Sequence, residues 1–167
     1  KIAASLQPKN DSIQSMLGSL YYRTGNIDDA IVAYGNAVQL NPKDSENQYM
    51  KGRLLSSVKK FKEARVVLEE ALLLRKNDAP TYYELGLIAL AESDFIAADK
   101  SLGLAVKNDV NNHEYLKSLF DAKLGNKNYD EAVDTILKAI KLKPNNAMYV
   151  FSACIVYSKK RFYTAAI

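Results

Sequence analysis

The chain has 167 residues, of which 48% are hydrophobic and 25% charged, which is the composition of a folded globular protein and not of a disordered one. Its net charge of +4 favours acidic partners without requiring nucleic acid. The single cysteine excludes an intramolecular disulfide, and the apolar run at 85–91 is far shorter than the ~20 residues that span a bilayer, so we expect no transmembrane segment.

The first predicted helix follows Asn10, whose short side chain is suited to capping the free amide groups at a helix start. Apolar residues three and four apart then continue to a polar turn at 24–26. A second helix of the same periodicity ends before Pro42, because proline cannot continue a helix. Residues 11–44 are therefore expected to form a helical hairpin.

The same pattern recurs every 34 residues, and we call a set of positions 34 residues apart a column. Two columns hold alanine throughout, a third holds large apolar or aromatic residues, and Asp44, Asp78, Asn112 and Asn146 repeat the capping position of Asn10. The three columns are Ala30, Ala64, Ala98, Ala132 and Ala166; Ala3, Ala37, Ala71, Ala105 and Ala139; and Ile27, Phe61, Phe95, Tyr129 and Tyr163. The predicted helices are, in chain order, 11–24, 28–40, 45–58, 61–74, 79–92, 95–107, 113–125, 129–142 and 147–160.

This pattern resembles the tetratricopeptide repeat family, most fully in the first repeat. The residues that carry the resemblance there are Leu17, Gly18, Tyr21, Gly25, Ala30, Tyr34, Ala37 and Pro42. The resemblance implies an all-α, right-handed superhelical solenoid of helix-turn-helix repeats, with no β-sheet. It implies a single array over 1–167, with repeats at 11–44, 45–78, 79–112 and 113–146, the end of a preceding repeat at 1–10 and a partial repeat at 147–167. We interpret the chain as part of a longer array.

The alanine columns have a structural explanation, because small residues allow the helices of such a hairpin to approach closely. The fourth repeat departs from the pattern, with Phe120 in a column that holds glycine in the first three repeats and Lys123 in one that holds Tyr21 and Tyr157. Phe120 either fills the space left by the missing aromatic residue, which we favour, or splays the hairpin apart.

Residues suited to catalysis are sparse. The one histidine, His113, follows a predicted cap, and we expect it on the surface; Cys154 occupies the small-residue column, and we expect a packed thiol. No group of side chains has metal-ligand spacing, and no glycine-rich loop suits a phosphate. We therefore expect no enzyme activity, no cofactor and no metal.

Two basic clusters are predicted in the turns between paired helices, where they would line one rim. They comprise Lys59, Lys60, Lys62 and Arg65, and Lys159, Lys160 and Arg161. Solvated turns explain them best, and an acidic partner or anionic membrane surface is the alternative. Nucleic-acid binding is not expected, since no aromatic residues alternate with these charges.

The resemblance implies that the first helix of each repeat lines a concave surface, which takes a peptide or a helix of a partner protein. The residues in the groove-facing columns that we assign to partner binding are Tyr22, Tyr49, Arg53, Tyr83, Leu87, Lys117, Asp121, Phe151 and Ile155. Ser15 with Ser19 and Tyr83 with Leu87 stand where chaperone-binding relatives carry a Lys and Asn carboxylate clamp, so that clamp is not expected.

The sequence thus predicts a non-catalytic scaffold for protein–protein interaction within a multiprotein assembly. Two alternatives remain open at this point. The chain is the substrate-recognition arm of a larger enzyme, or it associates with itself through the open ends of the array.

Overall fold

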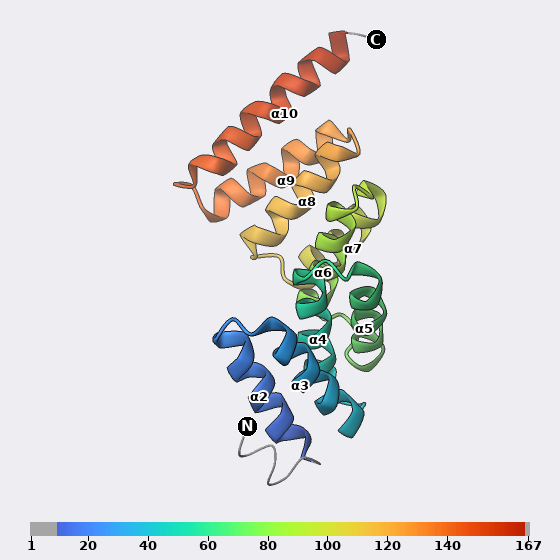
Figure 1. Cartoon of the computed structure of the whole chain (residues 1–167). Coiled ribbons are helices and arrows are strands. Elements are labelled where there is room, and N and C mark those ends of the chain that lie inside the picture. The colour runs from blue at the N-terminus through green and yellow to red at the C-terminus, as the bar shows by residue number, and fades with distance from the viewer. Residues whose placement is uncertain (1–9, 166–167) are drawn as a thin grey trace. The chain divides into compact units, whose positions relative to one another are not determined.

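The computed structural model describes residues 10–165, and within that range every regular element is a helix (Figure 1). The helices are α2 (Asp11–Arg23), α3 (Ile27–Leu40), α4 (Ser45–Ser57), α5 (Phe61–Leu74), α6 (Ala79–Ala91), α7 (Phe95–Asn108), α8 (His113–Gly125), α9 (Tyr129–Leu142) and α10 (Ala147–Ala165). The all-α prediction is confirmed, and every predicted helix start lies within one residue of the observed one. No helix among the described residues is both long and apolar enough to cross a membrane.

The predicted caps start the first helix of each hairpin. The side-chain oxygen of Asn10 accepts a bond from the amide of Ile13 at 3.2 Å, and that of Asp44 accepts from Glu46 at 2.9 Å. The same bond is made by Asp78, Asn112 and Asn146 at the later repeats. Each bond satisfies an amide that the helix itself leaves without a partner.

The turns between paired helices share one backbone feature. A residue with positive φ recurs every 34 positions, at Gly25 (79°), Lys59 (62°), Ser93 (60°) and Lys127 (61°). Glycine adopts this conformation freely, whereas side chains disfavour it. The three non-glycine residues keep it because the packed hairpins hold both ends of each turn.

The predicted end of the last helix is wrong. A turn was expected at 159–161, but α10 continues without interruption to Ala165. Arg161 continues the column of positive φ, but its backbone is helical. Lys159, Lys160 and Arg161 therefore lie in a helix and not in a turn.

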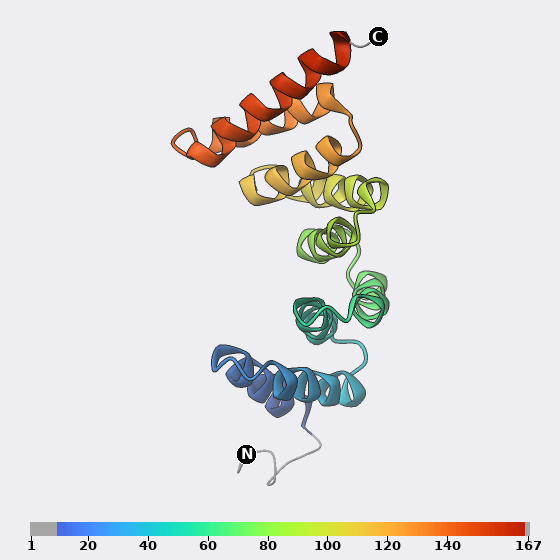
Figure 2. The ribbon, with the colours of Figure 1, turned by 45° about the horizontal axis from the view of Figure 1, so that its top comes forward.

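The chain divides into two compact units, Lys1–Lys76 and Asn77–Ile167. The first unit contains α2 to α5 and has a core around Ala30, Tyr34 and Leu54. The second contains α6 to α10, in which α8 packs on α7 and α10 packs on α9 (Figure 2). The tetratricopeptide prediction of stacked helical hairpins holds within each unit.

The alanine columns lie at the closest helix contacts. Their described members are at most 2% exposed: Ala30, Ala64, Ala98, Ala132, Ala37, Ala71, Ala105 and Ala139. Ala3 and Ala166 lie outside the described residues. The glycine column is equally tight, because a Cβ on Gly86 would lie 2.4 Å from Cγ of Leu102. These columns build the core, as the sequence indicated.

The fourth hairpin packs differently at the same columns. Phe120 is 2% exposed and belongs to a core with Ile136 of α9 and Val156 of α10. Lys123 is buried, and its ammonium group bonds Asp99 of α7 at 3.0 Å and Glu131 of α9. Burial by itself lowers the pKa of Lys123, but the two carboxylates outweigh it and raise that pKa above its usual value. The lysine therefore joins three helices in its charged form.

Candidate functional site

In the first unit, two of the predicted binding residues lie together. The guanidinium carbon of Arg53 on α4 lies 5.6 Å from the ring centroid of Tyr22 on α2, within the range of a cation–π contact. Tyr22 is 37% exposed, and Tyr49 and Arg53 are half-buried. This unit therefore presents a cation held over an aromatic ring between the first helices of two successive repeats.

In the second unit, Tyr83 of α6 is held by α8. Its ring centroid lies 4.5 Å from that of Tyr115, with 32° between the ring planes, and its hydroxyl accepts a hydrogen bond of 3.4 Å from Ser118. Tyr115 is 8% exposed, and burial raises the pKa of its phenol, so that the group stays protonated. Tyr83 is thus a half-buried aromatic side chain with a fixed ring, and Leu87, one turn further along α6, is also half-buried.

The predicted charged residues of α8 pair with each other. The ammonium group of Lys117 bonds both carboxylate oxygens of Asp121 at 2.6 and 2.7 Å, and it lies 5.4 Å from the ring centroid of Phe120. The two side chains are 22% and 42% exposed. This ion pair is therefore partly withdrawn from water and fixed in orientation.

The predicted residues of α10 are the most open. Phe151 is 65% exposed and Ile155 is half-buried. Next to them, Nδ1 of His113 at the start of α8 lies 2.7 Å from the hydroxyl of Tyr149, which is buried and belongs to α10. Together with the Tyr83–Tyr115 contact, this bond ties the first helices of three successive repeats of the second unit to one another.

Sequence reasoning missed two residues of this arrangement, Tyr115 and Ser118. Tyr115 stands 34 residues before Tyr149, so an aromatic pair in one column was the available signal. The partners of Lys123 were also missed. A lysine in a column that is apolar in other repeats indicates a carboxylate nearby, and Glu131 follows in the first turn of the next helix.

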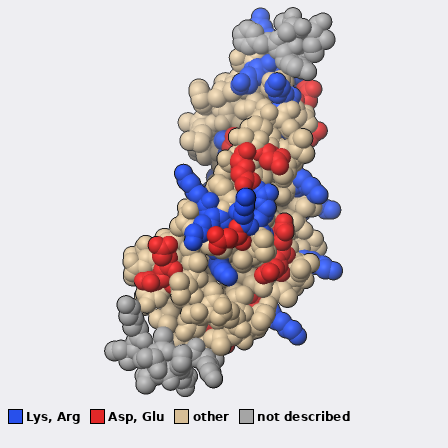
Figure 3. Space-filling model, turned by 45° about the vertical axis from the view of Figure 1, so that its right-hand side comes forward, with Lys and Arg blue, Asp and Glu red and all other residues tan. Residues whose placement is uncertain are grey.

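The basic clusters are not isolated from acidic groups. Lys59, Lys60 and Lys62 are exposed, and Arg65 is half-buried. Lys160 bonds Asp130 of α9 at 2.5 Å, which raises the pKa of the lysine. On the face that Figure 3 displays, acidic side chains lie beside the largest group of basic ones. On this face the basic charge is thus interrupted by acidic side chains.

Neither residue considered for catalysis lies in a catalytic arrangement. His113 bonds a buried tyrosine, and no group of three or more His, Cys, Asp or Glu side chains suited to a metal is found among residues 10–161. The packed thiol expected at Cys154 is wrong, because Cys154 is exposed. In the earlier repeats the second helix covers this column, and no described helix does so beside α10.

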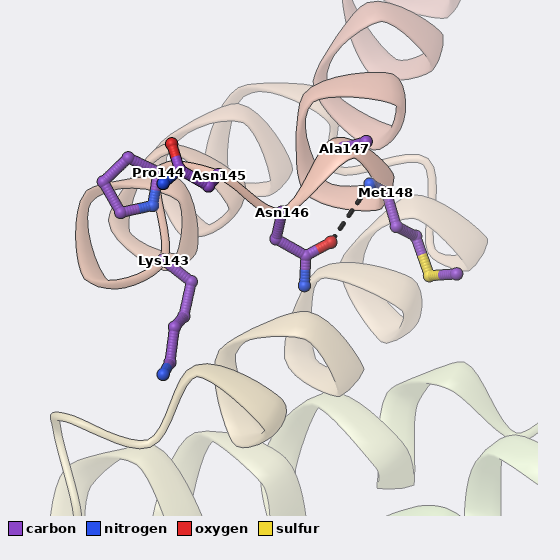
Figure 4. Close-up of a pocket in the computed structure, with 6 residues that line it drawn as sticks. All are labelled: Lys143, Pro144, Asn145, Asn146, Ala147 and Met148. Atoms are coloured by element: carbon purple, nitrogen blue, oxygen red, sulfur yellow. Dashed lines mark hydrogen bonds between the residues drawn. The ribbon is translucent and has the colours of Figure 1, made fainter.

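Two surface hollows lie apart from the predicted binding residues. The larger, of about 540 Å³, is formed by the turn between α9 and α10, where Asn146 caps the helix and Pro144 and Met148 contribute apolar atoms (Figure 4). The smaller, of about 370 Å³, lies between Val110 and the end of α9. None of the nine groove residues lines either hollow.

Comparison with known proteins agrees with the repeat pattern. A family model described as tetratricopeptide repeat matches residues 25–86, and a second with the same description matches residues 121–146, together more than half of the chain. No curated protein sequence matches the chain significantly.

Several solved structures have the same fold. A crystal structure of MamA superposes with a TM-score of 0.84 at 22% identity, covering 93% of this chain and 85% of that one. MamA from Desulfovibrio magneticus gives 0.85 at 19% identity, with 93% and 88% covered. YrrB, described as a tetratricopeptide protein with an unusual peptide-binding site, gives 0.82 at 19% identity, with 95% and 82% covered.

At these identities the structural likeness establishes an all-α solenoid fold, and the matched repeats establish the family. The chain belongs to the tetratricopeptide repeat family, whose fold is a scaffold for protein interaction.

Proposed function

We propose that the chain is a non-catalytic scaffold that binds a peptide segment or helix of a partner protein on the first helices of its repeats, and so organises a multiprotein assembly. Each unit contributes its own surface. In the first unit the contacting residues are Tyr22, Tyr49 and Arg53, and in the second they are Tyr83, Leu87, Lys117, Asp121, Phe151 and Ile155.

The observation that carries the proposal is the pair of aromatic side chains in one column of the second unit. Phe151 is 65% exposed, and Tyr83 is held with part of its ring open by Tyr115 and Ser118. Large aromatic side chains that a partner covers supply most of the binding energy of protein interfaces. A side chain that is already fixed also loses less conformational entropy when the partner binds.

The charged groups of the same surface supply direction. Lys117 stands in the same column between Tyr83 and Phe151, and its ion pair with Asp121 is partly shielded from water and so offers a donor and an acceptor at fixed places. Fixed charges of this kind set the register of a bound chain more than they add affinity. The peptide-binding site described for YrrB, a protein of the same fold, further supports a peptide as the ligand.

A displayed library of short peptides, selected on the immobilised chain, would provide the probe. Selected peptides are then titrated against Phe151→Ala, Tyr83→Ala and the control Ile96→Ala, which removes an equally exposed apolar side chain (74%) from the second helix of a repeat. We expect the two groove variants to weaken binding by about tenfold or more, because anchor truncation costs ~2 kcal/mol, and the control to bind as wild type.

The basic cluster at Lys59 and Lys60 provides the competing site. Binding there would fall steeply with added salt and would be lost on charge reversal of both lysines, whereas groove binding persists at raised salt. Groove variants that remain folded by circular dichroism and bind every selected peptide as wild type would disprove the proposal.

A further inference from the structure

The smaller surface hollow of the second unit combines an apolar base with a basic rim. Leu116 of α8 is 2% exposed and so forms its base, and Val110 before α8 and Leu142 at the end of α9 are 62% and 36% exposed beside it. We call this hollow of about 370 Å³ the α9 pocket. Its lining residues are Val110, Asn111, Leu116, Lys138, Lys141 and Leu142.

The two lysines of the α9 pocket are available to an anion. Both are exposed, and among residues 10–161 neither forms an ion pair and no acidic residue lines the pocket. Asp109, which precedes Val110, accepts a hydrogen bond from the side-chain amide of Asn112, and Asp134 lies one turn before Lys138 on α9. Two ammonium groups at the edge of an apolar surface favour a ligand that carries both an apolar group and carboxylates.

The corresponding positions of the earlier hairpins do not combine these features. In the three preceding hairpins the column of Leu116 holds a polar or aromatic residue, and the column of Lys138 holds no cation. The residues concerned are Gln14, Gln48 and Tyr82, and Asn36, Glu70 and Leu104. The apolar base and the pair of cations therefore come together only in the last of these four hairpins, α8–α9.

The α9 pocket stays open when a further hairpin follows. Lys107 and Asn108 stand in the columns of Lys141 and Leu142 one hairpin earlier, and both are exposed although α8, α9 and α10 follow them in the same unit. A hairpin that follows α8–α9 in the same way leaves Lys141 and Leu142 equally accessible. The opening is therefore a property of α8–α9 and its connection to α7.

We propose that the α9 pocket binds a short segment of a partner polypeptide in which one large apolar side chain is flanked by acidic ones. The apolar side chain covers Leu116, and the carboxylates pair with Lys138 and Lys141. A volume of about 370 Å³ is at the lower end of the range for ligand sites and suits one large side chain, not a packed helix. Because none of the groove residues lines this pocket, the proposal does not depend on groove binding.

The probe is an acetylated and amidated pentapeptide with phenylalanine at its centre, glutamate at both ends and serine between them. In an extended segment, residues two apart share one face, so both carboxylates lie on the side of the ring. One control peptide replaces the glutamates by glutamine, and the other replaces the phenylalanine by serine. Binding is followed through the amide NMR shifts of the chain.

We expect saturable shifts at Val110, Asn111 and Leu142. The glutamine peptide should bind about threefold to tenfold more weakly, because exposed ion pairs contribute little each. The serine peptide should bind about tenfold more weakly or less well still, because the ring supplies the buried apolar area.

A double variant locates the carboxylates. Lys138→Gln/Lys141→Gln should bind the probe as weakly as wild type binds the glutamine peptide, and it should bind the glutamine peptide as wild type does. Lys100→Gln/Lys127→Gln, which removes the same charge from two other exposed positions of the second unit, is the matched control and should bind as wild type. Val110→Ser should weaken the probe severalfold. Circular dichroism confirms that each variant is folded.

Several results would overturn the proposal. A probe that shifts no residue of the α9 pocket, or that binds the double lysine variant as tightly as wild type, contradicts it. Shifts in the pocket that grow with protein concentration without peptide would assign the pocket to a second copy of the chain. Binding to vesicles of phosphatidylcholine and phosphatidylserine that the double lysine variant loses would assign it to a membrane surface.

The groove variants keep the two proposals apart. Tyr83→Ala and Phe151→Ala should bind the probe as wild type, since neither residue lines the α9 pocket. Loss of probe binding in these variants, with shifts at the groove residues and none in the pocket, would contradict the pocket proposal and leave groove binding intact.

Discussion

The hairpins α6–α7 and α8–α9 of the second unit have the same backbone plan and different packing at the same columns. In α6–α7, Gly86 brings Leu102 so close that a Cβ would lie 2.4 Å from it, and the neighbouring column holds the buried Ala89. In α8–α9 those columns hold Phe120 and Lys123, and both are buried. One hairpin is built on small residues and close approach, and the other on a large ring and a buried lysine that pairs with two more exposed carboxylates.

This difference teaches that the repeat does not fix the size or polarity of the side chain at any one position. A change at one position is accommodated by the side chains that surround it. A phenyl group stands in the glycine column of α8, where it packs against Ile136 of α9 and Val156 of α10. Lys123, which stands where α6 has Ala89, is tolerated because Asp99 and Glu131 come from the two flanking second helices. The contribution of each packing arrangement to stability can be measured.

The largest effect is expected from Phe120→Ala. The side chain is 2% exposed in a core shared by three helices. Its removal leaves a cavity the size of the ring between α8 and α9. We expect the free energy of unfolding to fall by about 3–5 kcal/mol, measured by urea denaturation followed by circular dichroism. A loss under about 1 kcal/mol would mean that the hairpin can close to the α6–α7 geometry without the ring.

A smaller effect is expected from Ala98→Leu in the small-residue hairpin. Ala98 is fully buried beside Leu102, so a larger side chain must force α6 and α7 apart. Overpacking of this kind costs roughly 1–3 kcal/mol, again by urea denaturation. Lys100→Leu, at an exposed position of the same helix, is the matched control and should stay within about 0.5 kcal/mol of wild type.

The smallest effect, and the only one expected to depend on pH, is that of Lys123→Met. Methionine replaces the buried stem but leaves Asp99 and Glu131 without their cation, and we expect a loss of about 1–2 kcal/mol at neutral pH, since Glu131 is largely exposed. Lys138→Met, an exposed lysine of α9, serves as the control.

The pH dependence follows from the shifted groups. The bond to Lys123 lowers the pKa of Glu131 in the folded state, so this contribution is present above the unfolded pKa and is lost as the pH falls through the folded value. The raised pKa of Lys123 keeps the contribution intact through mildly alkaline pH. The difference between wild type and Lys123→Met should therefore shrink in acid, and a difference that stays constant down to pH 3 would show that packing, and not charge, makes lysine matter.

For much of the candidate site, the sequence predicted which positions are equivalent but not which side chains are in contact. The 34-residue columns placed Tyr83, Lys117 and Phe151 in one column, but not their surroundings. That Tyr83 rests on Tyr115, that Lys117 pairs with Asp121, and that Phe151 is far more exposed than Tyr83 depend on which side chains neighbouring repeats bring alongside. The 34-residue period identifies equivalent positions in different repeats. It does not predict contacts between side chains at non-equivalent positions.

The sequence alone predicted the helices and their caps, because these follow from interactions within one or two turns. It also predicted the buried alanine columns, because their spacing is repeated along the chain. Asn10, Asp44 and Asp78 cap where a local hydrogen bond requires it, whatever surrounds them. The burial of Lys123 and the contact of Tyr83 with Tyr115 were decided by the tertiary structure. Each depends on which side chains the neighbouring helices bring alongside, and the local chemistry of the residue does not encode that.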